Sequence, residues 1–118
     1  MTFKLQDDYN LLLTKSEIIR QGDVGGEIIF LIPTDKADVI IKYINGGNVL
    51  YKATPKLVDT DTPYKENLYR YSLAIDEQFT GIAGEIRLVM VISEDEVTIT
   101  TNEVYINIEP VDVAYTNE

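Results

Sequence analysis

Residues 84–92 read Gly-Glu-Ile-Arg-Leu-Val-Met-Val-Ile, and this stretch decides the fold class. From Ile86 onward every second residue is large and apolar, while Glu85 and Arg87 alternate with the first of them. Successive side chains of a β-strand point to opposite faces, so a period of two places the apolar ones together. The stretch therefore predicts a strand whose core-facing side consists of Ile86, Leu88, Met90 and Ile92.

The same alternation recurs on both sides of this stretch. Residues 26–32 place Ile28, Phe30 and Ile32 on one face. Residues 68–75 place apolar side chains on one face and Arg70 on the other. Further strand-like runs lie at 10–13, 17–21, 38–44, 49–53, 96–100 and 103–108. We expect the core between two sheets to contain Ile28, Phe30, Tyr71, Leu73, Leu88, Met90 and Ile106.

Polar turn residues separate these runs. Asn45-Gly46-Gly47-Asn48 predicts a tight hairpin, because Asn and Gly accept the positive φ that such turns need. We also predict turns at Ser93-Glu94-Asp95 and at Thr101-Asn102. Only residues 76–79 suit a single helical turn, which Gly81 would end.

These patterns predict an all-β fold, an immunoglobulin-like antiparallel β-sandwich of roughly eight strands. A length of 118 residues is typical of one domain, and a hydrophobic content of 45% is enough for one core. We expect the sandwich to occupy residues 1–110, with residues 111–118 as a C-terminal tail or the start of a linker.

The composition excludes several classes of function. The chain has no Cys and no His, so thiolate chemistry and catalytic triads that use His are ruled out. Its net charge is −10, and the basic residues are scattered singly along the sequence. Nucleic acid and anionic membrane surfaces are therefore poor candidates for partners, because binding to phosphates relies on clustered Lys and Arg. No apolar run approaches the roughly 20 residues of a membrane span.

Carboxylates are the remaining candidates for chemistry. Asp59 and Asp61 alternate in the polar segment 59–67, but the further acidic positions of a calcium loop are missing. The run at residues 94–96 is also acidic, and a hairpin tip favours polar residues in any case. Paired carboxylates hydrolyse glycosides without His, yet nothing in the sequence singles out one pair. We therefore expect no enzyme activity, catalytic residue, metal site or cofactor.

Two of the predicted strands are apolar on both faces. Ile29 and Leu31 form the second face of residues 27–32, and Val89 and Val91 form that of residues 89–91. A strand that is apolar on both sides is covered on both sides. Either other parts of the same chain cover these four residues, or they form an interface with a partner or another subunit.

The order of these segments resembles the N-terminal domain of upper-baseplate and tail-fibre-type proteins of phages that infect Gram-positive bacteria. The resemblance lies in the turn 20–23, the strand 27–32, the segment 79–84 with the long strand after it, and the closing strand 104–108. Together these cover most of residues 8–110.

This resemblance implies a virion structural module that docks a tail fibre or baseplate protein onto the tail. It further implies other tail or baseplate proteins as partners, a trimeric assembly, and a location in the virion after synthesis in the cytoplasm of the bacterial host. The family has no catalytic residues to transfer to this chain. The alternative hypothesis is a bacterial cell-surface or carbohydrate-binding β-sandwich module.

Overall fold

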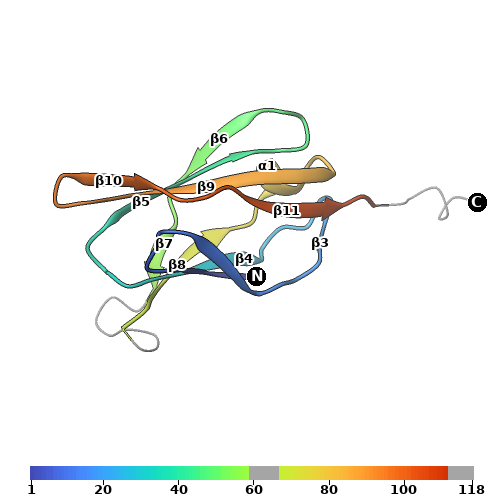
Figure 1. The fold of residues 1–118 in the computed structure, drawn as a ribbon. Helices are drawn as coiled ribbons and strands as arrows, with labels where there is room; N and C mark the ends of the chain where they lie inside the picture. Colours follow the sequence, from blue (N-terminus) through green and yellow to red (C-terminus); the bar gives the residue numbers. More distant parts are fainter. Residues whose placement is uncertain (59–66, 112–118) are drawn as a thin grey trace, which may run out of the picture.

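Two β-sheets packed face to face form the protein (Figure 1). The structure is a computed structural model, and it describes residues 1–58 and 67–111. The fold is nearly all-β and sandwich-like, which confirms the predicted fold class at this level. Asp59, Asp61 and the predicted tail from residue 112 onward lie outside the described residues.

Sheet A contains five strands in the order β2-β1-β4-β8-β7, and sheet B contains six, with the main order β3-β11-β9-β5-β6. The sixth strand, β10, pairs with β9. The strands of sheet A are β1 (Thr2–Leu5), β2 (Leu11–Lys15), β4 (Glu27–Ile32), β7 (Lys56–Val58) and β8 (Tyr69–Ala74). Those of sheet B are β3 (Ile19–Arg20), β5 (Asp38–Ile44), β6 (Leu50–Ala53), β9 (Gly84–Glu94), β10 (Val97–Thr100) and β11 (Val104–Glu109).

Two strand pairs contradict the expectation of a purely antiparallel sandwich. Strand β1 runs parallel to β4, and β3 runs parallel to β11. A parallel pair needs a long connection, and the chain supplies one by passing from sheet A to β3 of sheet B before it returns as β4. The described residues form eleven strands, where about eight were expected, and the strands absent from the predicted runs are β1 and the three-residue β7.

The core between the sheets contains every residue predicted to lie in it. Phe30 is completely buried, and its ring stacks on that of Phe3 with 5.8 Å between the ring centroids. The side chain of Phe79, from the single helical turn α1 (Glu77–Thr80), packs edge-on against Tyr43. The predicted core residues are buried throughout: Ile28, Phe30, Tyr71, Leu73, Leu88, Met90 and Ile106. The alternating pattern thus identified the inner faces correctly.

The single helical turn forms where the sequence predicts it. The Asp76 carboxylate caps α1 by accepting a hydrogen bond from the backbone N–H of Phe79, at 3.1 Å. Thr80 is buried, and its hydroxyl donates to the carbonyl of Asp23 at 2.7 Å. Through this hydrogen bond, the end of α1 contacts the connection that precedes β4.

The hairpin between β5 and β6 forms as predicted, but its glycines are needed for another reason. Positive φ occurs at Asn48 and not at Gly46 or Gly47. A Cβ atom at Gly46 would collide with the carbonyl oxygen of Ala83, and one at Gly47 would lie 2.8 Å from Ile82. The two glycines therefore permit close packing against the segment before β9 and do not set the turn geometry.

The acidic turn between β9 and β10 lies slightly later than predicted. Strand β9 extends to Glu94, which pairs with Val97, so the turn itself consists of Asp95 and Glu96. Both turn residues have positive φ, 51° and 68°. Tight hairpins use this geometry because it matches strand twist, but they usually place Asn and Gly there.

The turn predicted at Thr101-Asn102 does not form, since residues 101–103 are neither turn nor strand. Strands β10 and β11 both pair with β9, one after the other along the same side, and not with each other. Residues 101–103, between β10 and β11, interrupt the strand pairing along this side of β9. Thr101 bridges this break, because its N–H donates to the carbonyl of Met90 and its hydroxyl accepts from the N–H of Met90.

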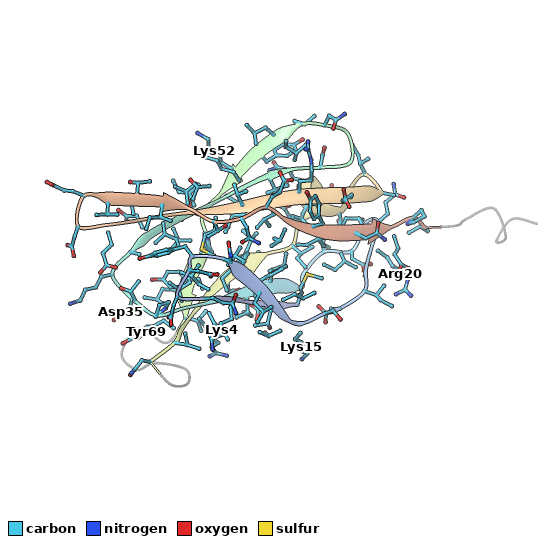
Figure 2. The ribbon with its side chains drawn as sticks, in the orientation of Figure 1. Lys4, Lys15, Arg20, Asp35, Lys52 and Tyr69 are labelled. Atoms are coloured by element: carbon cyan, nitrogen blue, oxygen red, sulfur yellow. The ribbon has the colours of Figure 1, made fainter. Side chains whose placement is uncertain are left out.

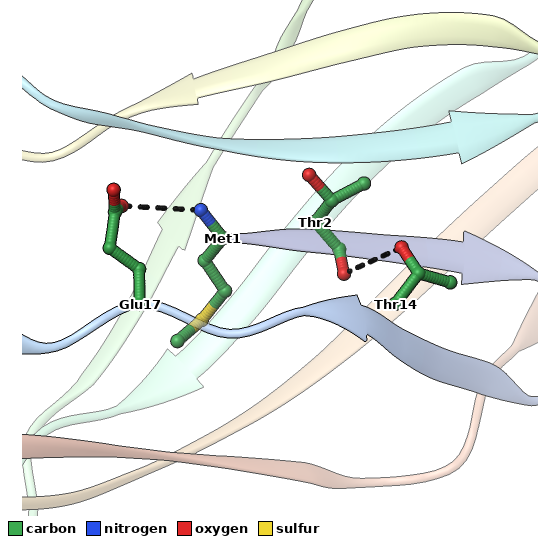
Figure 3. A network of polar contacts seen from close by, with 4 residues as sticks. All are labelled: Met1, Thr2, Thr14 and Glu17. Atoms are coloured by element: carbon green, nitrogen blue, oxygen red, sulfur yellow. Dashed lines mark hydrogen bonds and ion pairs between the residues drawn. The ribbon is translucent and has the colours of Figure 1, made fainter.

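The first strand is held at both of its sides. The backbone N–H of Ile29 donates to the carbonyl of Met1, which starts the parallel pairing with β4. On the other side, the amino group of Met1 lies 3.2 Å from the carboxylate of Glu17, and the Thr14 hydroxyl donates to the carbonyl of Thr2 (Figure 3). These contacts order β1, although its sequence shows only two buried apolar positions, Phe3 and Leu5.

Candidate interaction surfaces

The four residues predicted to form a partner interface lie on two opposite faces of the molecule. Ile29 and Leu31 point outward from β4 in sheet A, because Ile28 and Phe30 point into the core. Val89 and Val91 point outward from β9 in sheet B for the same reason. All four are half-buried. The sandwich separates the two pairs, so one flat partner surface cannot contact all of them.

The outer faces also gather basic residues that are scattered in the sequence. Alternation and strand register place three basic side chains on the outer face of sheet B and four on that of sheet A, out of ten in the chain. Those of sheet B are Lys42, Lys52 and Arg87, and those of sheet A are Lys4, Lys15, Lys56 and Arg70. Figure 2 shows Lys52 on the outside of one sheet and Lys4 and Lys15 on the outside of the other. Along the sequence these seven basic residues look isolated. The alternation within each strand is the signal that could have revealed their grouping on the outer faces.

The outer face of sheet B combines these charges with apolar side chains. Strand register aligns Leu50, Ile44, Arg87 and Tyr105 in one row across four strands. A second row contains Lys52, Lys42 and Val89, and a third contains Ile40, Val91 and Thr100. We call these ten residues the sheet B outer face. Leu50 and Tyr105 are the most exposed of its large hydrophobic side chains, at 59% and 56%.

Two local features affect the charge of this face. Lys42 and Lys52 lie directly opposite each other in the antiparallel pair β5–β6, where like charges repel. The Tyr105 hydroxyl donates to the carboxylate of Glu103 at 2.8 Å, and this hydrogen bond raises the pKa of Tyr105. The paired lysines would interact favourably with carboxylates of a partner. Glu103 and Glu85 lie at the border of this face that is farther from the two lysines.

A cleft of about 370 Å³ opens between the two sheets at one end of the sandwich. We call it the end cleft. Its floor is apolar and includes Leu5 and Ile32 of sheet A and Ile92 of sheet B. Its mouth is lined by Tyr9, Pro33, Thr34, Glu94, Asp95, Val97 and Ile99. Val97 is 57% exposed, which leaves a large apolar side chain in water at the mouth.

Carboxylates concentrate around this end. The buried Tyr71 hydroxyl donates to the carbonyl of Thr34 at 2.9 Å, and the Thr34 hydroxyl lies 3.3 Å from the carboxylate of Glu94. Burial, together with the negative charges of Asp35, Glu94 and Asp38, raises the pKa of Tyr71 from 10.0 to about 12. Burial is the main cause of this rise, and the three carboxylates add to it; their negative charge at this end of the sandwich favours cations over anions as ligands.

Across residues 1–58 and 67–111, no group of three or more carboxylates lies close enough together to hold a metal ion. Asp59 and Asp61 lie outside these ranges, so the prediction that they hold no metal stays a prediction. Among the helices of the described residues, none is long and apolar enough to cross a membrane.

No protein-family model and no curated protein matches this chain.

Proposed function

We propose that this chain is a non-catalytic docking module of a phage tail or baseplate, built on an immunoglobulin-like sandwich. It would attach a fibre or baseplate protein to the tail, as part of a trimeric assembly in the virion. The sheet B outer face is the observation that carries this proposal. On a chain of net charge −10, it combines exposed apolar side chains with three basic ones.

This face has the properties of a protein-binding surface. Monomers rarely expose large contiguous apolar patches, and Tyr and Arg are enriched at protein interfaces. Leu50, Tyr105 and Ile40 supply exposed apolar area, and Arg87 lies between Ile44 and Tyr105. A partner that offers carboxylates to Lys42 and Lys52 would relieve the repulsion between them.

The resemblance to phage tail and baseplate proteins also supports the proposal, and two of the segments that resemble them lie together in the fold. The turn 20–23 and the segment 79–84 are distant in sequence but adjacent in the fold. The N–H of Gly22 donates to the carbonyl of Thr80, and the Gln21 side chain donates to the carbonyl of Gly81. Two of the segments that resemble the phage proteins are therefore in direct contact, one shortly before β4 and the other before β9.

Immunogold electron microscopy tests the virion location. Antibodies against this chain should label the tail or baseplate of particles purified from the organism that carries the gene. Particles that contain no copy of the chain would contradict the phage assignment, whatever the properties of the outer face.

Charge reversal on the two sheets tests the docking surface itself. The double variant Lys42→Glu, Lys52→Glu should remain folded and lose incorporation into particles. The matched control Lys4→Glu, Lys56→Glu changes the net charge equally on the outer face of sheet A and should still be incorporated. Equal incorporation of both folded variants would show that the sheet B outer face is not the docking surface.

A bacterial cell-surface or carbohydrate-binding module is the second candidate. Tyr9 at the mouth of the end cleft favours it, since this exposed residue lines the same cleft as Glu94 and Asp95. Sugar rings stack on aromatic side chains and donate hydroxyls to carboxylates. Cell-wall oligosaccharides should then shift the Tyr9 ring resonances on titration, and a Tyr9→Ala variant should lose this response.

A further inference from the structure

Strand β10 has an unpaired edge beside the end cleft. It pairs with β9 only, and in the described part of the chain no other strand pairs with its second side. The N–H of Thr101 donates to Met90 of β9, so the pairing alternation directs the backbone groups of Ile99 and Val97 to β9 as well. The N–H and C=O groups of Thr98 and Thr100 therefore point outward from the sheet edge.

The side chains of the same strand connect this edge to the end cleft. Val97 and Ile99 line the cleft, whereas Thr98 and Thr100 alternate with them on the outer face. An extended segment that paired with Thr98 and Thr100 would place every second side chain over the apolar floor. A cavity of about 150 Å³ already holds a molecule the size of benzene. The end cleft, at about 370 Å³, has room for a large apolar side chain.

The charge around the cleft selects the polar residues of such a segment. Glu94, Asp95 and Glu96 form the tip of the β9–β10 hairpin, directly beside the free edge. Asp35, in the connection between the sheets, and Asp38, the first residue of β5, add negative charge near Tyr71. Lysine or arginine in the segment would be attracted to this end of the molecule, and acidic residues would be repelled.

We propose that β10 and the end cleft bind an extended segment of a partner protein in which apolar residues alternate with lysine or arginine. The segment adds a strand to sheet B, so that its backbone pairs with Thr98 and Thr100. Its apolar side chains enter the end cleft, and its basic side chains face the acidic tip. Strand addition of this kind takes affinity from backbone hydrogen bonds and specificity from alternate side-chain pockets. The site shares only Thr100 with the sheet B outer face, where this residue lies on the edge strand β10, so it goes beyond the docking function proposed above.

Nuclear magnetic resonance titration with a short peptide of alternating lysine and valine tests this proposal. The peptide should shift the backbone amide signals of Val97–Thr100 and of residues in the end cleft. A peptide with the same sequence but N-methylated at alternate residues cannot make the edge hydrogen bonds and should bind at least about tenfold more weakly. A peptide with glutamate in place of lysine should bind more weakly by about the same factor.

Protein variants separate the acidic tip from general charge. Asp95→Asn with Glu96→Gln should weaken binding of the lysine peptide about tenfold. Glu85→Lys changes the net charge by the same amount near the other end of β9 and should leave the affinity within about twofold. Val97→Lys places an ammonium group at the cleft mouth on an exposed position and should abolish binding while the domain stays folded.

Several results would overturn the proposal. Absence of any shift, equal affinity for the N-methylated peptide, or shifts confined to residues of the sheet B outer face other than Thr100 would each exclude strand addition at β10. Shifts at Tyr9 with cell-wall oligosaccharides but not with the peptide would assign the end cleft to carbohydrate. Sedimentation that shows a dimer lost on Thr98→Pro would assign the edge to a second copy of this chain.

Discussion

Strands β4 and β9 have apolar side chains on both their inner and outer faces, but these side chains differ in their surroundings. Ile28 and Phe30 on the inner face of β4 are completely buried, whereas Ile29 and Leu31 on its outer face are half-buried. Strand β9 shows the same contrast between Met90 and Val91. Hydrophobicity alone therefore does not distinguish the side of a strand that stabilises the fold from the side that is free to bind.

Neighbouring side chains explain why the outer residues are half-covered. Ile29 lies between Thr2 and Ser72, and Val89 lies beside Lys42. Long lysine side chains cover apolar neighbours with their methylene groups while the ammonium stays in water. The apolar residues of the outer faces are thus partly covered, although no second layer packs on them. Their contribution to the free energy of unfolding should be much smaller than that of the inner-face residues.

The largest loss of stability is expected from a substitution that removes a buried side chain from an inner face. Phe30→Ala should lower the free energy of unfolding by about 3–5 kcal/mol, because it removes a buried ring and leaves a cavity beside Phe3. Urea denaturation followed by circular dichroism measures the change. A loss below about 1 kcal/mol would show that Phe30 does not contribute to the core as the structure indicates.

The next effect concerns Tyr71, whose buried hydroxyl links the core to the acidic end. Folding raises its pKa from 10.0 to about 12, so the folded state holds the phenol proton more tightly than the unfolded state does. The stabilisation is complete below pH 10 and is lost as the pH rises towards 12. We expect the free energy of unfolding to fall by about 2–3 kcal/mol over this interval.

Tyr71→Phe is the matched control for this pH dependence. It removes the titrating group and the hydrogen bond to Thr34, so stability at neutral pH should fall by about 1 kcal/mol. Above pH 10 its unfolding free energy should decline less steeply than that of the wild type. Part of the slope should persist, because burial also raises the pKa of Tyr43. Identical slopes in both proteins would contradict the assignment to Tyr71.

The sequence predicted the inner faces because alternation is a local property. Ile28, Phe30, Leu88 and Met90 needed only their neighbours in the chain to be identified. Alternation says nothing about which strands share a sheet. For this reason the sequence did not predict the parallel pairing of β1 with β4. It also did not predict that Ile29 and Val91 lie on opposite sides of the sandwich.

The candidate surfaces depend even more on long-range packing. The floor of the end cleft brings together Leu5, Ile32 and Ile92, which lie far apart in the sequence. The pair Lys42 and Lys52 becomes a charged row only once the β5–β6 register is known. The role of Gly46 likewise follows from its contact with Ala83 and not from its own turn. From the sequence alone, only the acidic hairpin tip and the outward-facing Val89 and Val91 were evident.

A smaller effect is expected at the break between β10 and β11. Thr101→Val removes the hydroxyl that accepts a hydrogen bond from the N–H of Met90, at 3.0 Å. Because this donor is buried, the free energy of unfolding should fall by about 1–3 kcal/mol, and hydrogen exchange at the Met90 amide should accelerate. Thr100→Val, on the adjacent exposed position, should change stability by less than about 0.5 kcal/mol. Equal effects of the two substitutions would show that the bridge at Thr101 contributes nothing specific.

The smallest effect on stability is expected on the outer faces. Ile29→Lys and Val91→Lys should each cost less than about 1 kcal/mol, because a lysine at either position keeps its methylene groups on the sheet and its ammonium in water. The matched inner variants Ile28→Lys and Met90→Lys bury an unpaired charge and should prevent folding. Thermal unfolding measures all four. A domain that unfolds with Val91→Lys would show that the chain itself covers this residue, and the docking surface on sheet B would then be wrong. A folded Val91→Lys variant that is lost from particles, together with a folded Ile29→Lys variant that is retained, would place the interface on sheet B and not on sheet A.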